Sequence, residues 1–281
     1  MALTHELVPT SFSLAAVFAW GASDFLGGYA SRRANAFVVT TIAHASGLIL
    51  MCTLAGVTRA PFLSWHSLAW AIAAGTSGGT ALAIFYRALA MGRMGLTAPV
   101  AALLGAAIPT AVGVFTEGFP GTLRVSGFLL AGLGIWLISR TEDGSGSEGI
   151  GLAAIAGVGF AGFYLGMREA GDASALWLAT FTRTGGLIVT GTIVILQKSF
   201  REITRDSARW GMLAGFLDVT GTALFVRASQ TGRLDSAVVL TSLYPAVTVL
   251  LARVVLDEHF TRWKMVGMLA AMLAVPLIAG Q

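Results

Sequence analysis

Four ionisable side chains lie inside long apolar stretches of the sequence: Asp24, His44, Arg183 and Asp218. A charged group in the hydrocarbon of a membrane costs several kcal/mol, so such groups face a cavity or an oppositely charged partner. Asp24 follows Trp20 by four residues, which places both on one face of a helix. We expect them to present an aromatic wall and a carboxylate to one cavity, where the carboxylate binds a substrate amine or a coupling proton. The alternative is a structural carboxylate bonded to neighbouring backbone or hydroxyl groups.

Arg183 and Asp218 have opposite charges at similar depths in consecutive apolar stretches, which predicts an ion pair. Such a pair is either structural or opens and closes during transport. His44 has the side chain that titrates nearest to neutral pH and is a candidate proton relay. Because small residues surround it in the sequence, the alternative is a packing residue that makes hydrogen bonds.

Three tyrosines combine an aromatic body with a polar tip. Tyr244 lies within an apolar stretch beside Pro245, and prolines at such positions break helices where substrates bind. We expect Tyr164 and Tyr244 near the cavity, whereas Tyr86 is either a cavity residue or a tyrosine of the membrane interface. The candidate site for substrate binding and coupling therefore comprises eight residues: Trp20, Asp24, His44, Tyr86, Tyr164, Arg183, Asp218 and Tyr244.

The composition sets the context for these residues. The chain has 281 residues, of which 56% are hydrophobic and only 11% are charged, against about 25% charged residues in soluble proteins. So few charges cannot cover the surface of a soluble domain. The composition excludes a cytosolic globular enzyme, a disordered chain and a disulfide scaffold, and it predicts an integral membrane protein. The net charge of +4 comes from residues scattered in short loops, which gives no basic face for nucleic acid.

Ten apolar stretches are long enough to cross a membrane as helices. They are too long and too uniformly apolar for the alternating strands of a membrane barrel. The sequence therefore predicts an all-α integral membrane protein with ten transmembrane helices. The stretches cover residues 11–30, 36–57, 67–90, 95–115, 123–139, 149–168, 173–196, 209–230, 234–255 and 263–280.

An internal repeat divides the chain. Residues 87–94 read RALAMGRM and residues 227–234 read RASQTGRL, an offset of 140 (227 minus 87). The sequence GTAL occurs at 79–82 and again at 221–224. The fourth stretch of each half contains a proline, Pro109 and Pro245, and is followed by a glutamate, Glu117 and Glu258. Five spans per half is an odd number, so the second half enters the membrane from the opposite side. We expect two inverted five-helix repeats, residues 1–140 and 149–281, joined by an acidic flexible linker at 141–148.

Several motifs together resemble the EamA-type members of the drug/metabolite transporter superfamily. They are FAWGASDFLGG at residues 18–28, YRALAMGR at 86–93, and SLYPAVTVLLAR at 242–253 followed by Asp257-Glu258, where the family usually has Gly-Glu. The resemblance covers the whole chain. It implies a secondary transporter of the cell (inner) membrane, commonly an exporter of amino acids, other metabolites or drugs. Its substrate would pass by alternating access through a central cavity, driven by a proton or substrate gradient. An importer or a facilitated exchanger of the same fold is the alternative.

Some motifs are missing from the sequence. It has no GxxxxGK[ST] phosphate loop, no HExxH and no cluster of His and Cys, so we expect no ATP-driven pump, no intramembrane metalloprotease, no bound metal and no cofactor. The single cysteine, Cys52, excludes an internal disulfide, and we expect it to be buried. A membrane scaffold or an intramembrane lipid enzyme remains as the alternative outside transport. The partners that we expect are a small-molecule substrate and the lipid bilayer.

The orientation in the membrane stays open. Most Lys and Arg residues fall in the loops on the side opposite to the two termini. The positive-inside rule would place these loops in the cytoplasm and the termini outside, whereas the resemblance implies cytoplasmic termini.

Overall fold

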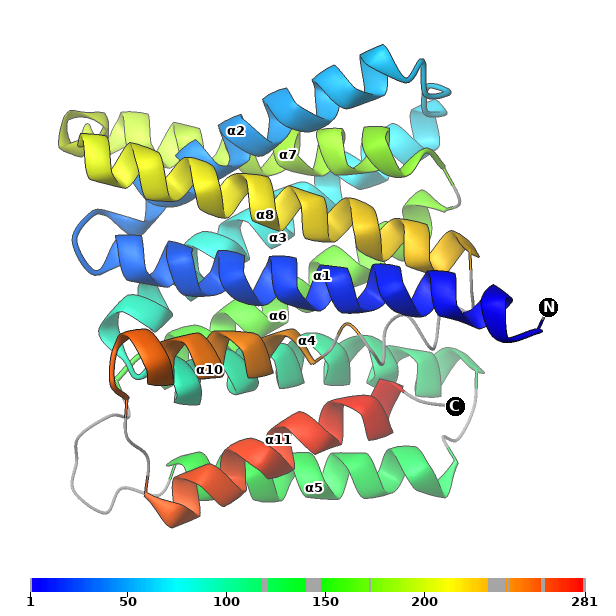
Figure 1. Ribbon diagram of the computed structural model, residues 1–281, viewed down its shortest axis with the longest axis vertical. Helices are drawn as coiled ribbons and strands as arrows, with labels where there is room; N and C mark the ends of the chain where they lie inside the picture. Colours follow the sequence, from blue (N-terminus) through cyan, green and yellow to red (C-terminus); the bar gives the residue numbers. More distant parts are fainter. Residues whose placement is uncertain are drawn as a thin grey trace.

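The computed structural model describes residues 2–117, 121–139, 148–171, 173–231, 241, 243–258 and 261–279. In this part of the chain the secondary structure is helical throughout, with no strand. With the labels of Figure 1, the elements are α1 (Ala2–Ser31), α2 (Ala36–Val57), α3 (Trp65–Met91), α4 (Met94–Glu117), α5 (Thr122–Ser139), α6 (Ile150–Ala170), α7 (Ala175–Leu196), the 3-10 helix η1 (Ser199–Glu202), α8 (Arg205–Thr231), α10 (Tyr244–Val255) and α11 (Arg262–Ala279).

The helices follow the apolar stretches of the sequence closely, and local capping explains two of the starts. The α2 helix covers the same residues as the predicted span 36–57 and begins after Asn35, whose side chain accepts a hydrogen bond from the Phe37 amide at 2.9 Å. Ser64 caps α3 in the same way, by accepting from the Ser67 amide at 3.1 Å. The first part of the predicted span 234–255 lies outside the described residues, as does the linker expected at 141–148 apart from Glu148.

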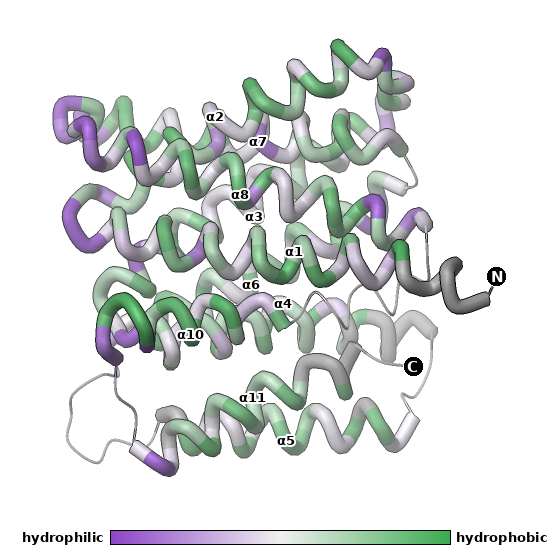
Figure 2. The backbone as a smooth tube through the Cα atoms, in the orientation of Figure 1, coloured by the Kyte–Doolittle hydropathy of each residue, from purple (hydrophilic) through white to green (hydrophobic). Residues whose placement is uncertain are grey.

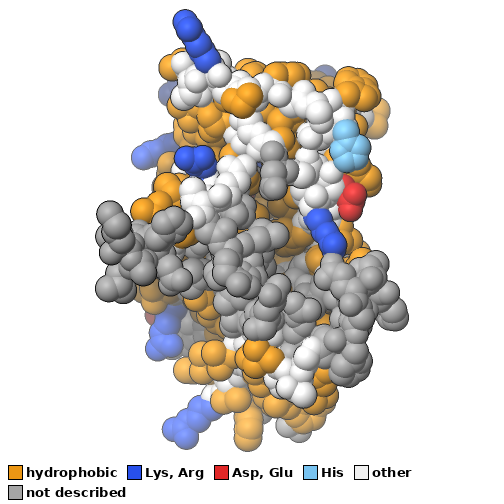
Figure 3. All heavy atoms as spheres, turned by 90° about the vertical axis from the view of Figure 1, so that its right-hand side faces the viewer, with side chains coloured by type: hydrophobic (Ala, Val, Ile, Leu, Met, Phe, Trp, Pro, Cys, Tyr) orange, Lys and Arg blue, Asp and Glu red, His pale blue; other side chains and the backbone are white. Residues whose placement is uncertain are grey.

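Five of the described helices contain segments long and apolar enough to cross a membrane: Ala36–Val57, Trp65–Met91, Ile150–Ala170, Ala175–Leu196 and Arg205–Ala228. Shorter apolar segments lie at Met94–Pro109, Val125–Gly134, Tyr244–Val255 and Met265–Ala274. Hydrophilic residues gather at the helix ends and in the connecting loops, while the helix bodies are apolar or neutral (Figure 2). Seen along the helices, one end of the bundle shows apolar side chains among uncharged polar groups and backbone, with isolated charged side chains (Figure 3). This distribution is that of a protein surrounded by lipid.

The helices form a bundle with their axes roughly along one direction (Figure 1). One end of the stack holds α2, α7 and α8, the other end holds α5 and α11, and α1, α3 and α6 lie between them. The α3 helix packs against α6 and α7, and α8 packs against α1 and α2. The α4 helix packs on α6, and α10 packs on α1 and α4. The middle of the bundle is therefore surrounded by helices from both halves of the sequence.

Small residues allow these helices to approach closely, as is usual in lipid, where hydrophobicity does not drive helix association. At the crossing of α3 and α7, Gly75 lies against the backbone of Thr182, and Gly185 lies against the backbone of Ile72. A Cβ atom on either glycine would overlap the facing carbonyl oxygen. The crossing brings the α7 side chains next to α3, which is where the cavity described below forms.

The burial expected for Cys52 is wrong, because the structure places this residue at the exposed surface of α2. In a membrane helix an apolar environment does not require the protein interior, since lipid provides one as well. An apolar run around a cysteine therefore does not tell which side of the helix it occupies.

Candidate functional site

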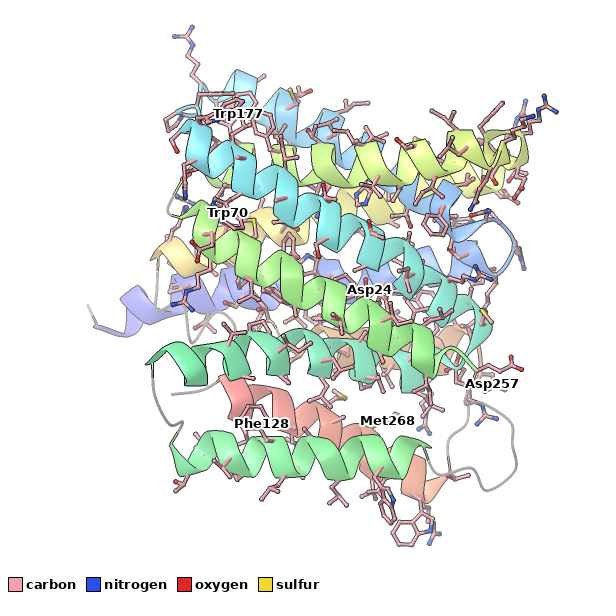
Figure 4. All side chains as sticks on the ribbon, turned by 180° about the vertical axis from the view of Figure 1, so that it is seen from behind. Asp24, Trp70, Phe128, Trp177, Asp257 and Met268 are labelled. Carbon is pink, nitrogen blue, oxygen red and sulfur yellow. The ribbon has the colours of Figure 1, made fainter. Side chains whose placement is uncertain are left out.

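A cavity of about 600 Å³, counting its mouth, lies in the middle of the bundle between α1, α3, α6, α7, α8 and α10. Asp24 lies midway along the helices, whereas Asp257 lies at one end of the bundle (Figure 4). Six of the eight predicted residues line the cavity: Trp20, Asp24, Tyr164, Arg183, Asp218 and Tyr244. The other lining residues are Gly75, Gly78, Gly79, Leu82, Phe160, Phe163, Thr182 and Thr222.

One wall of the cavity holds an ion pair. Arg183 on α7 contacts Asp218 on α8 through Nη1 and Oδ2 at 2.5 Å, and its Nη2 donates to the Thr222 hydroxyl at 2.8 Å. That hydroxyl in turn donates to the Asp218 carbonyl oxygen at 3.1 Å. The pair predicted from the sequence is present, and the two charges compensate each other. Among the described residues, Arg183 Nε is buried without a hydrogen-bond partner.

Asp24 on α1 lines the same cavity, and its exposed fraction is 7%. Within the described part of the chain, no hydrogen bond or ion pair involves its carboxylate. A carboxylate at this depth normally has a partner, because an isolated charge in a low-dielectric environment costs several kcal/mol. The cavity thus contains one carboxylate whose charge is compensated and one whose charge is not.

Aromatic rings surround these charged groups. The Trp20 indole N–H donates to the Asp218 carbonyl oxygen at 3.2 Å, which ties α1 to α8. Its ring lies edge-on to Tyr244 at 6.0 Å and tilted against Phe225 at 5.5 Å between centroids. On α6, Phe163 and Tyr164 meet edge-to-face at 5.5 Å. Because the indole N–H is already bonded, the part of Trp20 left for a ligand is its ring.

Tyr86 belongs neither to the cavity wall nor to the membrane interface. Its side chain is fully buried, which makes the interface interpretation wrong. The Tyr86 hydroxyl lies 3.2 Å from that of Ser23, which donates to the Ala214 carbonyl oxygen at 2.8 Å. The ring packs directly on Gly27, where a Cβ atom would overlap it. Tyr86 therefore joins α1, α3 and α8 beside Asp24, as a residue that positions the helix carrying the carboxylate.

His44 lies one layer behind the cavity. Its ring is wedged between Gly79 on α3 and Gly186 on α7, and Gly79 is itself a lining residue. The side chain is 1% exposed, and neither ring nitrogen has a hydrogen-bond partner among the described residues. In this conformation His44 does not reach the space that a substrate would occupy.

Sequence reasoning missed the lining residues Phe160, Phe163, Thr182 and Thr222. Thr222 belongs to the repeated GTAL motif, whose first copy supplies Gly79 and Leu82. The repeat offset of 140 leads from Trp20 to Phe160 and from Asp24 to Tyr164, and all four residues line the cavity. The repeat offset therefore carries a signal for Phe160 as well as for the order of the helices.

A second cluster of contacts closes one end of the bundle. The Glu258 carboxylate, beyond α10, contacts the Arg32 guanidinium at 3.1 Å. It also accepts hydrogen bonds from the Met94 and Gly95 amides at 3.1 and 3.2 Å. These amides begin α4, and a helix N-terminus favours a negative charge. Glu258 therefore connects α1, α4 and α10 at a single point.

Residues 147–280 match the EamA-like transporter family. The second half of the chain is therefore similar to this family. Its members are membrane transporters of the drug/metabolite transporter superfamily, and the apolar helices agree with a multi-pass membrane protein. No protein with curated annotation shows significant sequence similarity to the chain.

A solved crystal structure supports the fold over nearly the whole length of the chain. It superposes with a TM-score of 0.66 at 17% sequence identity, and the match covers 97% of each chain. At this identity the likeness shows the fold alone.

Proposed function

We propose that this EamA-like protein is a secondary transporter of the cell membrane that exports a small metabolite or drug by alternating access through the central cavity. The observation that carries the proposal is Asp24, an uncompensated carboxylate in the wall of a cavity at the middle of apolar helices. Such a group binds whatever positive charge enters the cavity, either an ammonium group of the substrate or a coupling proton.

The cavity also favours transport over a scaffold. A scaffold would bury its polar residues against one another, as Arg183 and Asp218 do. It would gain nothing from leaving Asp24 unpaired, because burial of an unpaired charge costs stability. A lipid enzyme would need a reactive cluster, and the described residues contain no group of three or more His, Cys, Asp or Glu side chains that could hold a metal ion.

The helix contacts support two related halves. The α3 helix packs on α6 and α7, and α8 packs on α1 and α2. If α1 to α3 correspond to α6 to α8, exchanging the halves turns the first set of contacts into the second. Inverted halves around a central site provide two alternative arrangements of the same contacts, which is the basis of alternating access in many transporters.

The Glu258 cluster supplies a point at which one end can open. The cluster joins α1, α4 and α10 through one carboxylate, and the Glu258 side chain is only 8% exposed. Opening this end requires that the Arg32 contact and the two amide contacts separate. In the proposed cycle, release of Glu258 accompanies access to the cavity from this side.

The test is uptake by proteoliposomes that contain the full-length protein, with and without a pH gradient. The labelled panel contains organic cations, zwitterionic amino acids, anions and neutral compounds. We expect saturable uptake of one class, reduced by roughly ten- to hundredfold in D24N because a charged contact worth about 1.5–3 kcal/mol is lost. The matched control is D206N, which removes an exposed carboxylate at the start of α8 and should transport like the wild type.

A folded D24N protein that transports at the normal rate, with the normal response to the pH gradient, would contradict the role of Asp24. Uptake stimulated by the gradient supports proton coupling, and uptake that ignores the gradient supports facilitated exchange. If no class of compound is taken up, the transport proposal fails.

A further inference from the structure

We infer that the cavity selects substrates that carry one positive charge and no carboxylate, that is, an amine on an apolar or aromatic body. This inference rests on the proposed transport function and narrows its substrate class. Three observations carry it: the charges in the cavity wall, the partners that the hydrogen-bond donors there already have, and the nature of the uncharged walls.

The charges come first. Among the described lining residues, the carboxylic acids are Asp24 and Asp218 and the only base is Arg183. Asp218 and Arg183 are in direct contact and compensate each other. The charge of Asp24 is left over, so the described lining residues together are short of one positive charge. An amine supplies that charge, whereas a zwitterion or an anion brings a negative charge with it.

The second observation concerns the hydrogen-bond donors in the cavity wall. A substrate carboxylate would need a guanidinium or ammonium partner to replace its hydration. The Arg183 guanidinium already contacts the Asp218 carboxylate through Nη1, and its Nη2 donates to the Thr222 hydroxyl. The Trp20 indole N–H is bonded to the Asp218 carbonyl oxygen. Among the described lining residues the positive charge of Arg183 is therefore already paired, and a substrate carboxylate would have to compete with Asp218 for it.

The third observation concerns the aromatic side chains of the cavity wall. Five aromatic residues line the cavity: Trp20, Phe160, Phe163, Tyr164 and Tyr244. The faces of aromatic rings attract cations, most strongly in Trp, and rings that surround an acidic group form the type of site that binds alkylammonium ions.

Four ligands that differ mainly in charge test this inference. Phenethylamine is a cation, phenylalanine a zwitterion, 3-phenylpropionate an anion and 2-phenylethanol is neutral, and each has a phenyl ring on a short chain. Their affinities for the purified full-length protein are measured by calorimetry in one detergent. We expect phenethylamine to bind roughly ten- to hundredfold more tightly than the other three, since only it compensates Asp24 without burying an unpaired carboxylate.

Two protein variants accompany the ligand series. In D24N the preference for phenethylamine should fall to less than about threefold, since the charge that selects it is gone. In D206N, whose carboxylate is exposed at the start of α8, the preference should equal that of the wild type. The comparison among ligands in the wild type stands even if D24N does not fold.

The inference is overturned if phenylalanine or 3-phenylpropionate binds the wild type as tightly as phenethylamine. The liposome panel separates this failure from failure of the transport proposal. Saturable uptake of phenylalanine that is lost in D24N would support the transport proposal and reject the proposed selection of amines without a carboxylate. If none of the four ligands binds and no compound on the panel is taken up, both proposals are rejected.

Discussion

Two carboxylates share one cavity in this EamA-like protein and have opposite surroundings. Asp218 contacts the Arg183 guanidinium, which also bonds the Thr222 hydroxyl, so its charge is matched inside the protein. Asp24, on the facing helix α1, has no such partner among the described residues. The difference separates two roles. A compensated charge contributes to the structure, whereas an uncompensated charge costs stability and is retained for something that enters the cavity.

The largest expected effect comes from removing the partner of the compensated carboxylate. Replacing Arg183 by Met leaves Asp218 buried and unpaired, which should cost about 3–5 kcal/mol of unfolding free energy. The double variant R183M/D218L should recover most of this loss, because a buried ion pair can be replaced by apolar residues at little cost. Unfolding by SDS in mixed micelles measures both variants. A double variant as unstable as R183M would show that the charge pairing is not what the structure needs.

The next largest effect concerns which ligands bind, and it comes from removing the charge of Asp218. The D218N substitution frees the Arg183 guanidinium, so that the lining charges of Asp24 and Arg183 become equal and opposite. We expect phenylalanine to gain about tenfold in affinity and phenethylamine to lose a similar factor, since a charge-assisted contact is worth about 1.5–3 kcal/mol. Competition between the two ligands measures the change. An unaltered ranking in a folded D218N protein would mean that Arg183 does not control which charges the cavity accepts.

A smaller effect is expected at Trp20, an aromatic residue that lines the same cavity as the two carboxylates. The W20F substitution removes the hydrogen bond to the Asp218 carbonyl oxygen and weakens the attraction for cations, since Phe is a poorer cation–π partner than Trp. The affinity for phenethylamine should fall by about two- to fivefold, or about 0.5–1 kcal/mol. The affinity for neutral 2-phenylethanol should change less. Equal losses of affinity for both ligands would show that Trp20 contributes only to the shape of the cavity.

The sequence indicated where many of the described helices lie and three of the charged residues that line the cavity, because both signals are local. An apolar run of about 20 residues becomes a helix, and α2 occupies the same residues, 36–57, as the predicted span. Asp24, Arg183 and Asp218 stood out because a charge within such a run is costly. The pairing of the last two followed from sign and depth alone.

What could not be predicted depends on which side of a helix faces the interior. Phe160 and Phe163 line the cavity, but an aromatic residue in an apolar run carries no signal of its own. Tyr86 is close to the end of its helix in sequence, yet it is buried because Gly27 on α1 makes room for its ring. His44 lies behind Gly79 because of the way α3 crosses α7. These positions depend on how the helices pack against one another, and the local sequence pattern does not show that packing.

The measurement that tests the difference between the two carboxylates most directly is the thermal stability of D24N beside that of D218N, with D206N as the exposed control, in one detergent and without ligand. We predict that D24N melts at or above the melting temperature of the wild type, because the substitution removes an uncompensated charge. We predict that D218N melts lower by roughly 5–10 °C, because it leaves Arg183 without its partner. If D24N is destabilised as much as D218N, Asp24 has a structural partner in the protein, and the assignment of its charge to an entering substrate is contradicted.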